Sequence, residues 1–508
     1  MVGRAIWAVA AAGALLSATL WAPMGAWASE TGEDIDRPPD MSPDATPVET
    51  DFDIFKADPE YVDKPYDPER QIEIYGGKYA IDEPRPVLEI GRPLYREGPF
   101  REGIDVTGEK NLVYQHFMVY GDFRNAIGWS NDGATERAVI ATRLNLDIDW
   151  KLTATERLHA FIQPLDNNGR FTSWEFAGDD ARGPTLRANG DIETFFFEGD
   201  VGAIAAGLTN EYNSLDLPFS LGLNPIFLQN GVWVDDAFLG AAVAIPSINS
   251  PTLDISNADV TFFFGVDQVT TPAIKDGNGD NADHNINIYG IAAFVEALEG
   301  YFEGGYGFVQ GEDNFEDQSY HNATLAFTRR YGGWLSNSVR AIWTTGQHRE
   351  NGAQQTADGL LFLFENSLIT HKPLTLIPYA NGWVGLDRPQ PLAKDVGPLK
   401  NTGINFEADA LTQFPKLDDT GQNTYGAAIG LEYLFNLDQQ IVVEGAVLDT
   451  FEGDNEPGRP AKHDQYALGF RYQLPVTNWL ILRADGMYGW RMHDDDVSGA
   501  RFEVRAKF

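Results

Sequence analysis

Apolar and polar residues alternate with a period of two along this chain from about residue 112 onward. At the C-terminal end, one face of an extended segment would carry Ala500, Phe502, Val504, Ala506 and Phe508. The opposite face would carry Arg501, Glu503, Arg505 and Lys507. The same pattern recurs at residues 144–150, 425–435, 466–474 and 480–492. Because a β-strand places successive side chains on opposite faces, the pattern predicts an all-β fold.

These alternating segments are long for the strands of a soluble protein. Strands in soluble sheets average about five to six residues and cover an apolar core. Here the segments run for about 9 to 14 residues and carry charges along one whole face, which fits a tilted crossing of a hydrocarbon layer around a polar interior. Aromatic placement agrees, since Trp150 and Trp479 fall at one end of their segments and Trp490 at the other, as in two interfacial belts.

A sheet can cross hydrocarbon only if it has no edges, because every backbone polar group must be paired there. Short turns and longer polar loops divide residues 111–508 into about eighteen segments, with a range of about 16–18. The breaks include a short turn expected at 199–201 and a polar loop expected at 211–234, with a strand between them. We therefore predict a closed antiparallel transmembrane β-barrel, wide enough to enclose an aqueous channel.

The first 110 residues have a different character. Arg4, an apolar run over 5–20 and the small-x-small sequence ending at Ala28 are typical of a secretory signal peptide spanning residues 1–28 and cleaved after Ala28. An uncleaved anchor is the alternative, but the run is short for a membrane-spanning helix. Residues 29–110 are acidic and proline-rich, which predicts a partly disordered periplasmic extension.

Composition excludes several functions. The chain has 75 acidic and 37 basic residues and a net charge of −38, which argues against a nucleic-acid partner. It has no cysteine, so it forms neither disulfides nor thiolate metal sites. Acidic clusters such as Asp494-Asp495-Asp496 fall in the longer loops. They have two interpretations, namely solubility with divalent-cation bridging to lipid headgroups, or a vestibule that enriches cations.

The strand alternation assigns a set of charged side chains to the interior. Such residues can select permeants by charge and size, or can simply solvate the lumen and pair with one another. The candidate lumen-lining residues are Arg143, Asp147, Asp149, Arg157, Arg340, Glu432, Glu444, Arg471, Arg483, Asp485, Arg491, Arg501, Glu503 and Arg505.

One loop resembles the start of a calcium-binding loop, with Asp276, Asn278 and Asp280 at alternate positions. Asn281 and Asn287 stand where that motif requires glycine and glutamate, so a polar outer loop is the competing interpretation and no other cofactor is expected. The eight histidines are scattered and form no recognised catalytic motif. We therefore expect no enzymatic activity.

The C-terminal strand, with Phe508 at its end and Phe502 within it, resembles that of Gram-negative outer-membrane β-barrel proteins. The expected strand number and inward arginines also resemble the eighteen-stranded alginate-export and substrate-specific porin families. This resemblance implies insertion by the barrel assembly machinery, contact with outer-membrane lipid and lipopolysaccharide, possible oligomers, and passive diffusion of small hydrophilic solutes or ions. The alternatives are a soluble extracytoplasmic β-rich binding protein or hydrolase, and the barrel component of an export or electron-transfer complex.

Overall fold

A computed structural model describes residues 84–91 and 115–508 apart from short gaps at 154, 168, 180, 191, 278, 280, 408–409, 436–438 and 452–458. The predicted signal peptide over residues 1–28 lies outside the described residues. So does the predicted extension over 29–110, except for residues 84–91. In the part of the chain that is described, no helix is both long and apolar enough to cross a membrane.

Strands make up most of the described chain, and helices are few and short. The strands are β1 (Leu88–Gly91), β2 (His116–Asn131), β3 (Glu136–Lys151), β4 (Arg157–Ile162), β5 (Asp166–Asn167), β6 (Arg170–Gly178), β7 (Gly183–Thr185), β8 (Ile192–Asp200), β9 (Pro218–Leu228), β10 (Val234–Ser250), β11 (Ile255–Asp267), β12 (Ile286–Ala297), β13 (Gly300–Gly311), β14 (Tyr320–Tyr331), β15 (Leu335–Thr345), β16 (Asp358–Leu368), β17 (Leu376–Arg388), β18 (Ala393–Lys394), β19 (Thr424–Phe435), β20 (Gln439–Thr450), β21 (Gln465–Pro475), β22 (Leu480–Arg491) and β23 (Val497–Lys507). The helical elements are α3 (Val201–Thr209), η2 (Gln229–Gly231), η3 (Pro251–Leu253), η4 (Asp283–Asn285), η5 (Asp313–Gln318), η6 (Glu350–Gly352) and η7 (Pro398–Asn401).

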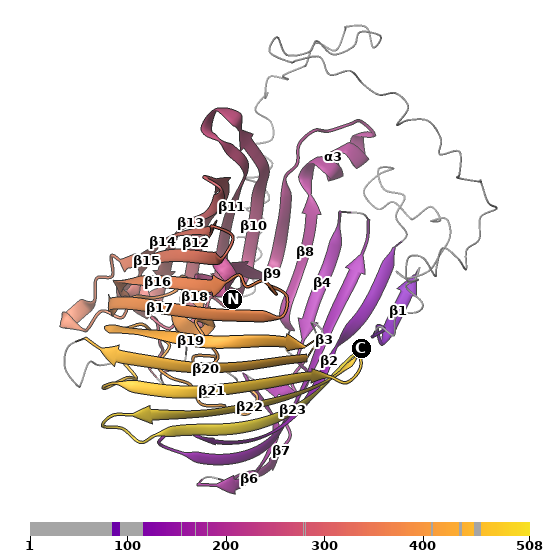
Figure 1. The fold of residues 1–508 in the computed structure, drawn as a ribbon. Coiled ribbons are helices and arrows are strands. Elements are labelled where there is room, and N and C mark those ends of the chain that lie inside the picture. The colour runs from indigo at the N-terminus through magenta and orange to yellow at the C-terminus, as the bar shows by residue number, and fades with distance from the viewer. Residues whose placement is uncertain are drawn as a thin grey trace, which may run out of the picture. The chain divides into compact units, whose positions relative to one another are not determined.

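The strands form a ring in which nearly every strand pairs antiparallel with its neighbour in sequence (Figure 1). The order runs from β2 through β3, β4 and β8 to β17, then through β19 to β23, and β23 pairs with β2 to close the ring. Strands β4 and β6 pair with different parts of β3 and together occupy one place in the ring. Strands β1, β5, β7 and β18 are short additions to it. The prediction of a closed antiparallel barrel is confirmed, with 18 strands.

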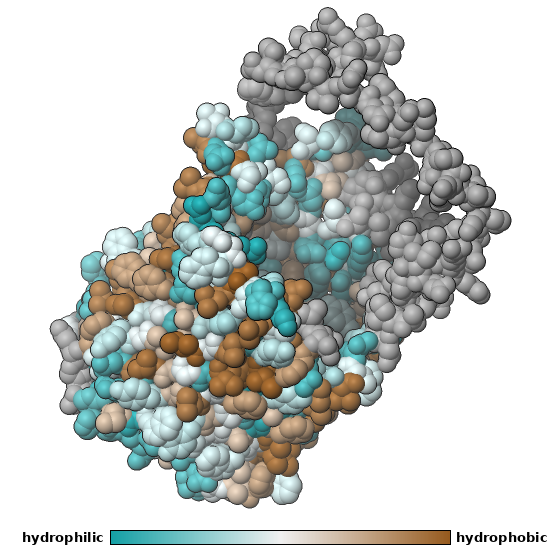
Figure 2. Space-filling model, in the orientation of Figure 1, coloured by the Kyte–Doolittle hydropathy of each residue, from teal (hydrophilic) through white to brown (hydrophobic). Residues whose placement is uncertain are grey.

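The alternation places apolar side chains outside and polar ones inside. Ile429 and Leu468, on β19 and β21, are 66% and 57% exposed, whereas Glu444 and Asp485, on β20 and β22, are 0% and 7% exposed. Figure 2 shows apolar residues spread over the wall that faces the viewer. A large apolar surface of this kind indicates contact with lipid rather than with water.

One stretch of the sequence prediction is wrong. The segment between the expected breaks at 199–201 and 211–234 is helix α3, and the missing strand, β9, lies inside the expected loop. The Asp200 side chain caps the helix by accepting a hydrogen bond from the Ala203 backbone N–H at 2.5 Å. An alanine-rich segment with such a cap favours helix over strand, although its apolar character alone suits both.

The interior of the barrel is partly filled by chain that folds inward from the end of the longer loops. The connection between β17 and β19, residues 389–423, enters the lumen and is called the constriction loop below. Its Leu399, Phe406 and Leu417 form an apolar cluster with inward side chains of the wall such as Trp383. The tip of the β9–β10 hairpin also turns inward, because Trp233 belongs to a second interior cluster.

Candidate functional site

The constriction loop begins with a short parallel pairing to the barrel wall. Strand β18 pairs with β10 at Val234 and Asp235, and the Leu392 backbone N–H donates to the Trp233 carbonyl at 2.9 Å. The fully buried Lys394 donates from Nζ to the Gly231 carbonyl oxygen at 2.7 Å. Burial lowers the pKa of Lys394 to about 8, because the charged ammonium has lost water. The start of the loop therefore holds a titratable group against the β9–β10 hairpin.

The middle of the loop is held by Glu444 on β20. Its carboxylate accepts hydrogen bonds from the backbone N–H groups of Ile404 and Asn405, both at 2.9 Å, and from the Asn405 side chain at 2.8 Å. The Tyr379 hydroxyl donates to the same carboxylate at 2.5 Å. With no exposed surface, Glu444 is an inward residue that anchors the loop rather than one that meets solutes.

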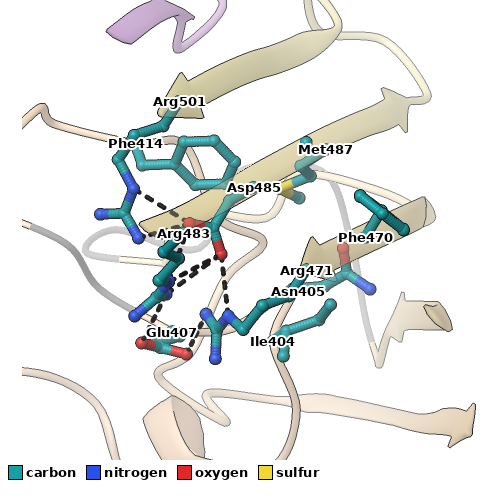
Figure 3. Close-up of a pocket in the computed structure, with 12 residues that line it drawn as sticks. Ile404, Asn405, Glu407, Phe414, Phe470, Arg471, Arg483, Asp485, Met487 and Arg501 are labelled. Carbon is teal, nitrogen blue, oxygen red and sulfur yellow. Dashed lines mark hydrogen bonds and ion pairs between the residues drawn. The ribbon is translucent and has the colours of Figure 1, made fainter. Parts of the chain in front are cut away.

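A cluster of charges joins the loop to strands β21–β23 (Figure 3). Asp485 accepts hydrogen bonds from Arg471 at 2.8 Å, Arg483 at 2.9 Å and Arg501 at 2.7 Å. Glu407, from the loop, accepts a hydrogen bond from Arg471 at 2.6 Å and lies 3.5 Å from Arg483. Three guanidinium groups thus share two carboxylates, one on the wall and one on the loop.

The balance of forces in this cluster is visible at Glu407. Burial alone raises the pKa of a carboxyl group, yet the charges of Arg471 and Arg483 outweigh it and hold the pKa of Glu407 below its usual value. Glu407 is therefore ionised at neutral pH, and its attraction to the arginines ties the loop to the wall. We call Glu407, Arg471, Arg483, Asp485 and Arg501 the loop latch.

The β9–β10 tip extends into the lumen as far as strands β14 and β15. Trp233 donates from Nε1 to Asn322 of β14 at 2.8 Å, and Asn322 in turn donates to the Gln390 carbonyl of the constriction loop at 2.7 Å. Gln229 accepts hydrogen bonds from Thr324 at 2.9 Å and from Arg340. The predicted lumen residue Arg340 is thus 1% exposed and supports the tip.

Other charged residues surround the part of the lumen formed by β2–β4 and β8. Arg157 and His159 lie 3.6 Å and 3.1 Å from Glu198, and the Arg157 and Glu198 side chains are 36% and 39% exposed. Arg143 donates to Asn145 at 2.8 Å. The structure therefore gives this side of the interior charges that water can reach.

The remaining candidates occupy several places on the inner wall. Asp147 and Asp149 lie on the inward face of β3, opposite Phe161 and His159 of β4. Arg505 lies where β23 meets β2, and both it and Arg124 donate hydrogen bonds to Asp122.

Glu432 accepts a hydrogen bond from Gln440, and the 5% exposed Glu503 is opposite Arg483 in the ladder. Arg491 lies at the rim and donates to the backbone carbonyls of Asp495 and Asp132, at 2.7 Å and 3.0 Å. The sequence pattern brings these side chains to one face but does not distinguish pore-facing from rim positions.

A cavity of about 200 Å³ at the loop end of the barrel is basic and was not predicted from the sequence. Arg137, Arg170, Arg182 and Arg187 line it, with Glu175 as its acidic residue. Its other boundary is the constriction loop, so residues of three separate segments meet there. Because these arginines lie in loops and at strand ends, periodicity gave no signal that could have grouped them.

The predicted calcium loop is only partly described. Asn278 and Asp280 lie outside the described residues, whereas Asp276 lies within them. Nearby, Lys275 pairs with Asn281 in an isolated bridge. Within the described ranges, no group of three or more acidic or histidine side chains is arranged to hold a metal ion. The calcium site stays a prediction.

Comparison with solved structures identifies the architecture. The chain is similar to the outer membrane protein opdK from Pseudomonas aeruginosa, with 12% identity, a TM-score of 0.51, and coverage of 77% of this chain and 98% of that one. It is also similar to OccK2 (OpdF) from the same organism (12% identity, TM-score 0.50, 77% and 97% covered). OccAB2 from Acinetobacter baumannii aligns with 11% identity, a TM-score of 0.50, and 81% and 99% covered. No family model and no curated protein matches the sequence. At such low identity, the likeness shows a shared eighteen-stranded barrel fold.

Proposed function

We propose that this protein is a porin of the Gram-negative outer membrane, through which small hydrophilic solutes or ions diffuse passively. The observation that carries the proposal is the closed ring of 18 strands with an apolar exterior and charged side chains inside. A barrel of this size is too wide for wall side chains alone to fill. The solved barrels that it resembles include outer membrane proteins, and this supports the proposed location. Insertion by the barrel assembly machinery and contact with lipopolysaccharide belong to the same proposal.

The constriction loop and the β9–β10 tip define the narrow part of the path. Their contacts leave the charged side of β3, β4 and β8 as the face that a passing solute meets. This face carries Arg157 and Arg143 together with Asp147 and Glu198, so the proposal is for a channel of mixed charge rather than a strongly anion- or cation-selective one. No bond is made or broken in this function, which distinguishes it from that of an enzyme.

The test is single-channel recording of the refolded mature protein in planar bilayers. We expect open channels with stepwise conductance and a small reversal potential in a salt gradient. Heat-modifiable migration on gels would show that the recorded protein is a folded barrel. Electrical silence of protein folded by that criterion would contradict the proposal, and solubility without detergent would favour the soluble alternative. Stable co-purification with a second protein would favour the export or electron-transfer alternative.

A further inference from the structure

Strands β8 and β9 are paired along only part of their length. Their ladder extends from Asp200 opposite Pro218 to Phe195 opposite Leu223. Beyond Leu223, β9 continues to Leu228 with β10 as its partner. Strand β6 does not pair with this part of β9 either, since its partners are β3 and the short β7. Within the described ranges, no strand pairs with residues 224–228 of β9 on the side that faces β8, so the hydrogen-bonded wall is interrupted there.

Two residues of β9 suit this interruption. Gly222, beside the last paired positions, has a φ of 131°, and a Cβ atom there would lie 2.3 Å from the Phe195 carbonyl oxygen. Glycine therefore permits the bend by which β9 leaves β8. Pro225 lies on the stretch without a β8 partner and has no N–H group to leave unpaired. The local sequence thus tolerates an open edge.

A cavity of about 790 Å³ occupies the interruption and has walls from both faces of the barrel. Pro225 and Phe227 lie on the exposed face of β9, and both line the cavity. Ile226, between them, packs against the interior apolar cluster and also lines it. Arg143 of β3 and Lys400 of the constriction loop line the same cavity from the lumen. A cavity with both kinds of lining connects the interior of the barrel with its outer surface.

The inner part of this cavity is lined by charged groups, most of them acidic. Asp235, Asp236, Asp283 and Asp395 line it with Glu193, against the two cations Arg143 and Lys400 and the histidine His284. Lys400 lies 3.5 Å from Asp235, and His284 lies 2.8 Å from Asp267, so both basic groups beside the loop are already paired. Charged groups keep water in the cavity, which satisfies the open edge of β9. Their acidic excess disfavours anions.

The outer rim of the cavity is apolar. Ile192 and Phe227, which line the cavity, are 47% and 63% exposed, and Phe195, at the last paired position of β8 beside it, is 50% exposed. Such side chains belong at the lipid-facing surface of a barrel. The passage therefore changes from a wet, acidic inner end to an apolar outer end, a combination that suits an amphiphilic molecule.

We propose that this passage, called the side window, lets small amphiphiles with an apolar body and a neutral or cationic head exchange between the lumen and the surrounding lipid leaflet. This inference rests on the proposed location of the barrel in a membrane, but not on diffusion of solutes along its axis. The axial path serves hydrophilic solutes, whereas the side window serves molecules that partition into lipid.

The absence of cysteine permits a direct test by single-cysteine labelling in the full chain. Phe227→Cys is modified in intact Gram-negative cells with a maleimide that carries a water-soluble polyethylene glycol chain. The control is Glu350→Cys, at an exposed position of the loop between β15 and β16, where the water-soluble reagent can also react. Uptake of the neutral amphiphile N-phenyl-1-naphthylamine is then measured. We expect labelling at position 227 to reduce uptake to that of cells without the protein, and labelling at position 350 to have no effect.

The outcomes separate this inference from the proposed function. Unchanged uptake after labelling at position 227, or failure of the cysteine there to react with the water-soluble reagent, would overturn the side window. Loss of conductance without loss of uptake would contradict the axial channel and leave the window intact. The anionic relative 8-anilinonaphthalene-1-sulfonate should show no protein-dependent uptake, and uptake equal to that of the neutral probe would overturn the assigned charge preference.

Discussion

The two sides of the barrel interior use the same alternating pattern for different purposes. On β20, β22 and β23, the inward residues Glu444, Asp485 and Arg501 are 0%, 7% and 6% exposed beneath the constriction loop. On β4 and β8, Arg157 and Glu198 form a pair at 3.6 Å whose side chains remain more than one-third exposed. The first group holds a loop in place, and the second faces water. An inward position therefore does not by itself place a residue on the permeation path.

Removing the constriction loop would have the largest effect on this comparison. Replacing residues 395–421 by a short glycine-serine turn should raise single-channel conductance several-fold, because Glu444 and the four latch residues on the wall would then face open water. Single-channel recordings of protein that still shows heat-modifiable migration provide the measurement. Removing the separate turn Glu350–Gly352 is the control and should leave conductance unchanged. Equal conductance with and without the constriction loop would refute its assignment as the narrow part.

Breaking the loop latch would have the next largest effect. Asp485→Asn leaves Arg471, Arg483 and Arg501 without the carboxylate that they share, a type of loss that costs about 3–5 kcal/mol for a buried pair. We expect the loop to become mobile and the channel to show frequent transitions between conductance levels. The matched control is Asp147→Asn, on the inward face of β3, which carries no residue of the loop latch and should leave the open level steady. Equally quiet recordings from both variants would show that the latch does not hold the loop.

Neutralising charges on the two sides should separate charge selectivity from conductance. Glu198→Gln removes a water-accessible charge, and the reversal potential should move toward anion preference, since a charge at about 4 Å acts on a passing ion with about 1 kcal/mol in water. Arg491→Gln should shift the reversal potential far less, because its guanidinium is bound to loop carbonyls at the rim. If Arg491→Gln gives the larger shift, the rim rather than the β4–β8 side controls selectivity.

The architecture was predictable because the alternation is local and repeated. The strand number and the closure of the ring follow from segments such as 480–492 and 500–508, in which the charged side chains all fall on one face. The constriction loop gave no comparable signal. Glu407 meets Arg471 across 64 residues of sequence, and Glu444 meets Asn405 across 39, so only the folded barrel brings them together. Single-sequence periodicity contains no information about such contacts.

Helix α3 and strand β9 illustrate a different limit. Both segments are short and apolar, and a short apolar run suits a strand or a helix equally well. The Asp200 cap and the alanines of 201–209 were available as signals for a helix. The β9 strand contains Gly222 and Pro225, which normally mark a turn, and this explains why the region was predicted as a loop. Those same residues form the side window.

Titration of Lys394 should have the smallest effect and would sharpen the comparison at the start of the loop. Its folded-state pKa is about 8, below the ordinary value of 10.5, because burial penalises the ammonium. Between pH 8 and 10.5 the folded protein releases this proton while the unfolded chain retains it, so the free energy of unfolding contributed by this group rises with pH in that interval. Below pH 8 both states are protonated and the penalty is present in full.

The pairing of β18 with β10 should therefore become firmer in alkaline solution, and loop-derived conductance fluctuations should become rarer as the pH rises above 8. Lys394→Met removes the titrating group and should give fluctuations that do not depend on pH in this range. Lys416→Met is the control, since Lys416 lies in the same loop with a partly exposed side chain paired with Asp419 and should preserve the pH dependence. If the fluctuations of Lys394→Met still depend on pH, another group controls the loop. The contact of β18 with the β9–β10 hairpin would then not depend on the charge of the Lys394 ammonium.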